Sequence, residues 1–396
     1  MSVAHTARAT HAPSSASHTA RGADRAEALK RFGAEIEAIR REVEAKLGAE
    51  DVRYVKKVDA FSRAMEVLGR VLIHVSPEPI TFLTGVTALW LHKQLQATEV
   101  GHTALHGAFD GLPGAERFQS KGFRWDVPID EESWDEGHNR RHHPYTNIAG
   151  KDPDIHFGPV RLTEHTPFRA HHRAQLPFTV FFLWPNFGFL MNLHFTGLND
   201  FYFGNDRADG MDFLPDRSWK TALTAHRRAL RKYLPHYLKE YAFFPLLAGP
   251  FFWKVMLGNW LAATARDVYS AVTIYCGHVG EDVASYPDGT RPRGQGAWYA
   301  MQVESANNFE VPLPISMLCG ALDLQIEHHL FPRFPTNRLR EIAPKVRAAC
   351  ERHGIRYKTD TWGRTLAKAL RQIARLSHPD RAAQPFAAAD VALGAA

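Results

Sequence analysis

The chain has 396 residues, of which 45% are hydrophobic and 25 are phenylalanine, and its formal net charge is +6 at pH 7. Its mean hydropathy is nevertheless slightly negative, so apolar blocks alternate with charged stretches, a mixture that is unusual for one compact soluble domain. Three widely spaced cysteines exclude a disulfide framework and a CxxC redox pair, and the basic residues follow no nucleic-acid-binding pattern.

The two ends of the chain are expected to contribute little to the folded domain. Residues 1–24 are rich in Ala, Ser, Thr and His, which predicts a disordered tail. Residues 25–60 have apolar side chains at helical spacing and predict a soluble amphipathic helical region. For residues 359–396 we expect a helix followed by a disordered, alanine-rich tail.

Two apolar blocks predict helical hairpins. In the first, residues 61–100, the sequence Ser-Pro-Glu-Pro at 76–79 separates two arms, because two prolines around an acid favour a turn. The second, residues 241–279, has its turn expected near Gly258 and Asn259. Each arm is at the short end of the roughly 20 residues that cross a bilayer. We therefore predict an all-α integral membrane fold with two transmembrane hairpins, that is, four spans.

Histidines gather in three motifs beside these blocks. "GHTALHG" places two histidines four residues apart, so that both rings project from one face of a helix. "EGHNRRHH" repeats the spacing and adds a neighbour, and "QIEHHLFP" contains a doublet. The doublet His171-His172 has no spaced partner and lies among arginines, so we expect it to face solvent. With one further histidine at the end of the second block, the candidate metal ligands are His102, His106, His138, His142, His143, His278, His328 and His329.

Eight imidazoles exceed the four ligands of one tetrahedral metal ion, so two metal ions are implied. Imidazole binds zinc, copper, iron and nickel, and ligand type alone does not select among them. Nitrogen-rich sites at a membrane face, without cysteine ligands, favour a redox metal that activates dioxygen. Ligating histidines usually donate their other ring nitrogen to a carboxylate or carbonyl, and the candidates for that role are Glu99, Asp135, Glu136, Asp323 and Glu327.

A single two-metal site requires all three motifs on one side of the membrane. An even number of spans must then separate the second motif from the third, so we interpret the apolar block at 176–198 as interfacial or re-entrant. Residues 199–240 contain eight Lys and Arg, which predicts a cytoplasmic location. A helical cap holding the metals is therefore expected on the cytoplasmic side.

The order HxxxH, HxxxHH, QxxHH, together with "HHPYTN", "GKDPDI", "SANNF" and "QIEHHLFP", resembles the membrane fatty acid desaturase family over about residues 61–358. The resemblance implies two iron ions held by the eight histidines, with His278 as the additional ligand before the third box. Many members begin that box with histidine, whereas this chain has Gln325, a variant found in front-end desaturases. Gln325 is therefore either a weak ligand or a hydrogen-bonding neighbour of a ligand.

Front-end desaturases usually contain a fused cytochrome b5 domain with an HPGG motif, which is absent from this sequence. Electrons are therefore expected from a separate protein of the ferredoxin or cytochrome b5 type with an NAD(P)H reductase. The implied reaction is dioxygen-dependent desaturation of a fatty acyl chain linked to CoA, a carrier protein or a lipid, in a bacterial cytoplasmic membrane. The alternatives are an acyl hydroxylase on the same scaffold and, more distantly, a metal transporter or sensor, which would place its ligands within the spans.

Overall fold

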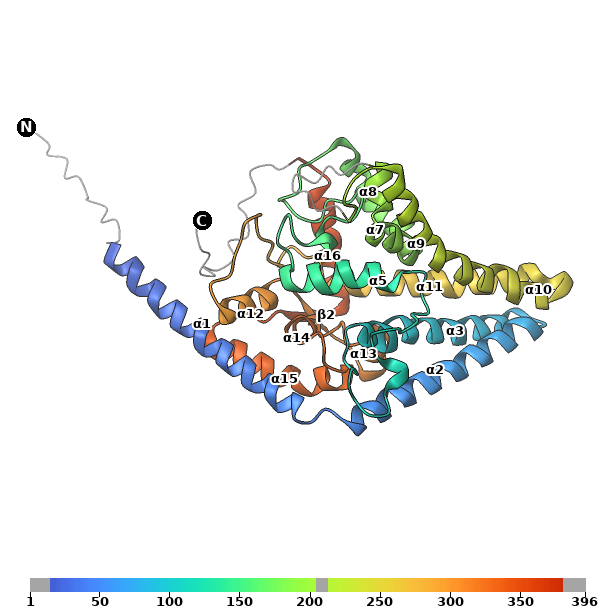
Figure 1. Cartoon of the computed structure of the whole chain (residues 1–396), viewed down its shortest axis with the longest axis horizontal. Coiled ribbons are helices and arrows are strands. Elements are labelled where there is room, and N and C mark those ends of the chain that lie inside the picture. Colours follow the sequence, from blue (N-terminus) through green and yellow to red (C-terminus); the bar gives the residue numbers. More distant parts are fainter. Residues whose placement is uncertain (1–14, 204–212, 380–396) are drawn as a thin grey trace, which may run out of the picture.

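The computed structural model describes residues 15–203 and 213–379. Within these residues the fold is helical apart from one short parallel pair of strands, β1 (Asn308–Glu310) and β2 (Thr359–Thr361). Two long helical hairpins extend side by side from a compact helical cap, and their tips lie at the same end of the molecule (Figure 1). This arrangement confirms the all-helical prediction.

The first hairpin consists of α2 (Ala49–Val75) and α3 (Pro79–Leu95) and turns at the predicted position. The Glu78 carboxylate accepts the backbone N–H groups of Ile80 and Thr81 at 2.6 and 2.8 Å, which caps α3. The two helices touch through glycines: a Cβ atom added at Gly69 would lie 2.6 Å from the backbone nitrogen of Leu89. Small residues therefore set the close approach of the two arms.

The second hairpin turns about nine residues before the predicted position. Its first arm is bent and its second arm, α11, continues through Gly258 and Asn259. The turn lies instead at η10, where Gly249 has a φ of +53°. Gly258 packs against Ile73, so its lack of a side chain serves helix contact. The elements are α9 (Trp219–Leu238), η9 (Lys239–Phe243), α10 (Phe244–Leu247), η10 (Gly249–Phe251) and α11 (Phe252–His278).

The apolar block at 176–198 belongs to a broken helix beside α11. Among the described residues, only the helical stretch Ala170–Phe195 has the length and hydropathy expected of a membrane span, so these two criteria do not confirm the four predicted spans. Most of the basic residues at 199–240 lie on α9, and Arg207 lies outside the described residues. The elements of this region are η6 (Ala170–Ala174), α6 (Gln175–Phe178), η7 (Thr179–Leu183), η8 (Trp184–Asn186), α7 (Phe187–Phe195) and α8 (Leu198–Phe203).

The cap encloses its own apolar core. The first helix, α1 (Ser15–Glu44), buries Phe32 and Ile36 against Ile326 and Ile342, so it belongs to the cap. α1 begins inside the tail predicted at 1–24, and residues 1–14 and 380–396 lie outside the described residues. The 60/61 boundary falls inside α2. The other cap elements are η2 (Glu116–Phe118), α5 (Glu131–Trp134), η5 (Pro153–Ile155), α12 (Gln295–Glu304), α13 (Leu313–Cys319), α14 (Gln325–Leu330), α15 (Thr336–His353) and α16 (Trp362–Leu376).

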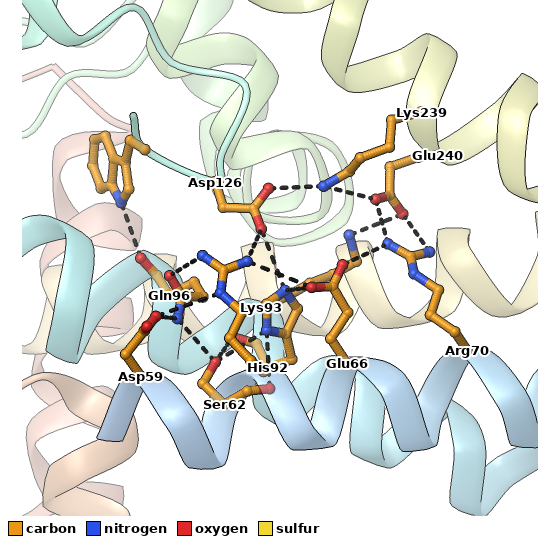
Figure 2. Close-up of polar contacts among 12 residues, drawn as sticks. Asp59, Ser62, Glu66, Arg70, His92, Lys93, Gln96, Asp126, Lys239 and Glu240 are labelled. Carbon is orange, nitrogen blue, oxygen red and sulfur yellow. Dashed lines mark hydrogen bonds and ion pairs between the residues drawn. The ribbon is translucent and has the colours of Figure 1, made fainter. Parts of the chain in front are cut away.

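A buried carboxylate joins all four arms of the two hairpins. Glu240 of η9 accepts two hydrogen bonds from Arg70 of α2, at 2.7 and 3.1 Å. It also forms an ion pair with Lys93 of α3 at 3.0 Å. Arg70 also donates to Asn259 of α11 at 2.9 Å. Figure 2 shows this carboxylate at one end of a longer network that continues through Lys239 and Asp126. The network fixes the hairpins relative to each other.

Replacing Glu240 with Gln keeps the shape of the side chain but leaves Lys93 buried without its counter-charge, and it leaves Arg70 with Glu66 alone, at 3.4 Å. Breaking a buried ion pair costs about 3–5 kcal/mol, so we expect a clearly lower midpoint of thermal unfolding for the detergent-solubilised protein. The control Glu281→Gln disrupts a 2.6 Å pair with Arg371 whose side chains are 44% and 58% exposed, and it should change the midpoint little. Equal effects of the two variants would contradict this account of the network.

Candidate metal centre

The histidines are presented by four separate chain segments at the base of the cap. His102 ends η1 (Gln96–His102), a π-helix that continues α3, and His106 follows the short α4 (Thr103–Leu105). His138 and His142 lie in η3 (Asp135–His142), which is also π-helical, and His143 opens η4 (His143–Tyr145). His278 ends α11, and the doublet of the third motif lies in α14. π-Helical turns are rare in proteins overall, but those that occur are often found at functional sites.

The structure brings all eight predicted histidines together. Seven of them form two groups in which the ligand nitrogens lie within 4.8 Å of one another. The eighth, His143, lies between the groups, with ring centroids 4.7 Å from His106 and 4.5 Å from His329. The first group is His102, His106, His138 and His328, and the second is His142, His278 and His329.

The nitrogen atoms of these rings fit metal ligation. The Nε2 atoms of His102 and His106 are 3.2 Å apart, and those of His278 and His329 are 3.1 Å apart. Two nitrogens bound to one ion at about 2.1 Å lie roughly 3.0–3.4 Å apart. Buried polar atoms normally have hydrogen-bond partners, yet within the described residues the Nε2 atoms of His138, His142, His143 and His328 have none.

The protonation state of the rings agrees with this fit. Burial, reinforced by neighbouring imidazoles, holds the pKa of His143, His328 and His329 well below its usual range. These rings are therefore neutral at pH 7, and each offers a lone pair. A pair of metal ions would satisfy nitrogens that the protein itself leaves unpaired.

Two aspartates orient the second histidine motif. Asp152, which is fully buried, accepts a hydrogen bond from Nδ1 of His142 at 2.9 Å, and Asp154 lies 3.2 Å from Nδ1 of His138. Although burial lowers the pKa of His142, these two carboxylates raise it to about 9. The bond to Asp152 holds a proton on Nδ1, so the proton on Nε2, which this pKa retains at pH 7, is the one that a metal ion would displace on binding.

The five carboxylates predicted for this orienting role are engaged elsewhere, so that prediction was wrong. Glu99, for example, binds Arg340, and Glu327 binds Asn308 and Tyr357. Among the hydrogen bonds between described residues, Asp135, Glu136 and Asp323 also contact other partners. The orienting aspartates come from "GKDPDI", ten and sixteen residues beyond the histidines that they contact. In the sequence, the only local signal of this orienting role was the Asp-Pro-Asp turn that contains both aspartates.

Gln325 and His329 each lie within hydrogen-bonding distance of other side chains. The Gln325 side-chain nitrogen lies 2.8 Å from Nε2 of His278, so the residue borders the second group. Nδ1 of His329 lies 3.0 Å from the Thr146 hydroxyl and 3.2 Å from the Gln302 amide oxygen. Neither Thr146 nor Gln302 was among the predicted site residues.

Two other groups that contain histidine lie apart from this centre. His171 is exposed as predicted, but His172 is buried and its Nδ1 accepts the Arg169 backbone N–H at 2.9 Å. The expectation that both rings face solvent was therefore half wrong. A separate group of Glu66, His92 and Asp126 lies in the hairpin network (Figure 2). Its carboxylates are already paired with basic side chains.

A cavity adjoins the histidines. His102, His138, His278 and Gln325 line it on one side, and much of the remaining wall is apolar. Along α11, Ile274 and Ser270 continue the wall away from His278 towards Arg266 and Asp267. The apolar wall includes Trp125, Ile129, Phe187, Met191 and Leu322. A narrow apolar space beside a metal centre suits a hydrocarbon chain.

Comparison with known proteins agrees with the family resemblance seen in the histidine motifs. A family model described as fatty acid desaturase matches residues 77–361. The chain is 31% identical over 367 residues to an NADPH-dependent stearoyl-CoA 9-desaturase of Mycobacterium tuberculosis, covering 89% of this chain and 81% of that protein. It is 26% identical over 288 residues to an sn-1 linoleoyl-lipid 6-desaturase of Synechocystis, covering 71% and 77%. The chain therefore belongs to the fatty acid desaturase family and is an oxidoreductase.

Proposed function

We propose that the protein desaturates a long-chain fatty acyl-CoA in a dioxygen-dependent reaction at a two-iron centre. The observation that carries this proposal is the pair of adjoining histidine groups at one side of an apolar cavity. The Mycobacterium tuberculosis relative, named as an NADPH-dependent stearoyl-CoA desaturase, supports CoA as the acyl carrier and NADPH as the electron source. A separate electron-transfer protein of the ferredoxin or cytochrome b5 type would deliver the electrons.

The eight histidines would hold two iron ions, which supply the activation of dioxygen when bound. Each turnover removes two hydrogens from adjacent methylenes and, with two electrons and two protons, reduces O₂ to two molecules of water. The protein's own contribution is positioning. The cavity walls hold the chain beside the histidines, Asp152 keeps His142 in one tautomer, and Gln325 borders the second group as a weak ligand or hydrogen-bonding neighbour.

The hairpins would embed the protein in a bacterial cytoplasmic membrane. α2 and α11 have 27 residues each, or about 40 Å at roughly 1.5 Å per residue, which exceeds the roughly 30 Å hydrocarbon layer. Exposed apolar side chains cover both hairpins towards their tips, as expected of a lipid-facing surface. Those on the first hairpin include Val67, Leu68, Val71, Val75, Ile80 and Leu83, and those on the second include Phe243, Leu246, Leu247, Phe251, Trp253, Leu257 and Trp260. The cap and its histidines would then lie on the cytoplasmic side.

The two alternatives are less well supported. A hydroxylase would use the same histidines and differ in adding oxygen to the chain, but the relatives are named as desaturases. A metal transporter would place its ligands along the spans, whereas here they lie where the hairpins meet the cap.

Substituting single box histidines tests the metal assignment. Purified, iron-loaded protein should contain about two iron ions per chain, since the chain offers two groups of ligands. His142→Ala and His328→Ala should each abolish detectable unsaturated product and lower the iron content, as measured by gas chromatography and metal analysis. The control His171→Ala removes an exposed ring, so this variant should retain both the unsaturated product and the iron content. One tightly bound zinc per chain, or active box variants, would refute the assignment.

Asp152→Asn tests the orienting aspartate, because the substitution keeps the size of the side chain but removes the acceptor charge at Nδ1 of His142. Loss of such a partner typically costs 10- to 100-fold in metal affinity or activity. We expect desaturation to fall by about that factor while the protein still inserts in membranes. Asp135→Asn serves as the control, because Asp135 contacts Asn139 and Arg140. Unchanged activity of Asp152→Asn would show that the carboxylate has no such role.

Cysteine labelling tests the membrane placement, because the native Cys276, Cys319 and Cys350 are buried and should give little background. Thr224→Cys on exposed α9 should react with an impermeant thiol reagent only after the cells are opened. Pro77→Cys, at the tip of the first hairpin, should react in intact cells. Labelling of Thr224→Cys from outside, or of Pro77→Cys only from inside, would overturn the proposed orientation.

A further inference from the structure

The cavity beside the histidines contains a buried ion pair. Arg266 and Asp267 are 4% and 8% exposed, and the guanidinium lies 2.8 Å from the carboxylate. Asp267 also accepts the backbone N–H of Gly188 at 3.2 Å, while Nε of Arg266 has no hydrogen-bond partner within the described residues. Beside the histidines the cavity wall also includes Asp154, whereas away from them Arg266 and Asp267 are its charged residues and much of the wall is apolar.

The ion pair lies at a defined distance along α11 from His278. His278, Ile274, Ser270 and Asp267 succeed one another at three- and four-residue intervals on α11, and all of them line the cavity. No residue of α11 before Arg266 lines it. Eleven residues separate Asp267 from His278, which corresponds to roughly 16 Å along a helix that rises about 1.5 Å per residue.

We propose that Arg266 and Asp267 form the floor of the acyl cavity and limit how many carbons lie beyond the new double bond. This proposal rests on the proposed function. A methyl end that reached further would have to separate a buried ion pair and leave each charge unsolvated, which is strongly unfavourable. A chain that stops above the pair leaves it intact. The floor therefore limits the length of the acyl segment between the new double bond and the methyl end.

The depth of the cavity gives an approximate limit. Bonds of about 1.5 Å in a zigzag advance an extended chain by roughly 1.3 Å per carbon, and the methyl end must remain about 3.5–4 Å from the floor. The roughly 16 Å between the ligand and the floor therefore accommodates about ten carbons. Substrates with a longer segment beyond the reacting carbons should be excluded.

Two variants should shift the chain-length preference in opposite directions. Arg266→Ala/Asp267→Asn removes the guanidinium, leaves no unpaired charge and keeps an acceptor for Gly188, so it should deepen the cavity. Ser270→Leu fills the cavity above the floor. The assay supplies saturated acyl-CoAs of increasing length to membranes with the electron-donor system and locates the double bond by mass spectrometry. Ala265→Leu adds the same side chain at an exposed position of α11 and is the control.

The deepened variant should accept a chain at least two carbons longer, with the double bond at an unchanged distance from the carboxyl end. Ser270→Leu should disfavour the longest natural substrate roughly tenfold for two lost methylenes, and Ala265→Leu should keep the original preference. If all the variants desaturate with one unchanged preference, the floor assignment is wrong. If the deepened variant does not fold, Ser270→Leu alone decides, since an unchanged preference refutes the proposal. An unmodified protein that forms no double bond refutes the proposed function instead.

Discussion

The neutralisation of the Glu240 carboxylate by Arg70 and Lys93 is the interaction on which the rest of the molecule depends. Each of the four arms contributes one group to this contact, with Asn259 completing it from α11. The contact sets the relative position of α3 and α11, and these helices lead directly to His102 and His278. The separation of two histidine-bearing segments is therefore set by a charge contact inside the hairpins. Cap packing then needs only to add the second and third motifs.

Helix α11 combines the functions that a desaturase must coordinate. Its end supplies His278, its middle supplies Ile274 and Ser270 for the cavity wall, and Arg266 and Asp267 lie further along the same face. Because a single rigid helix holds all of these side chains, the distance between His278 and the Arg266–Asp267 pair is fixed. An unactivated methylene offers no charge or hydrogen bond by which a site could select it. The reacting methylene must therefore be selected by a fixed distance along a rigid element.

The convergence of the eight histidines and the first hairpin could be predicted from the sequence because their signals are local: histidines at fixed spacing, and two prolines around Glu78. The second turn was misplaced because Gly258 and Asn259 have the composition of a turn, yet they serve contacts with Ile73, Arg70 and Glu240 from other helices. Asp152 was missed because its hydrogen bond to His142 depends on the path of the intervening loop. His172 is buried by an interaction with the backbone of Arg169, which spacing and charge do not reveal.

The π-helical segments Gln96–His102 and Asp135–His142 place an unusual demand on insertions and deletions. A π-helix has a wider turn than an α-helix, and removing one residue would return the backbone to the commoner geometry. That repair would strengthen local hydrogen bonding but rotate every following residue by about 100°, turning the histidine rings of these segments away from the other histidines. Gaps and insertions among relatives should consequently be absent from these two stretches and tolerated at the hairpin tips. In these segments the number of residues therefore matters as well as the identity of the histidines.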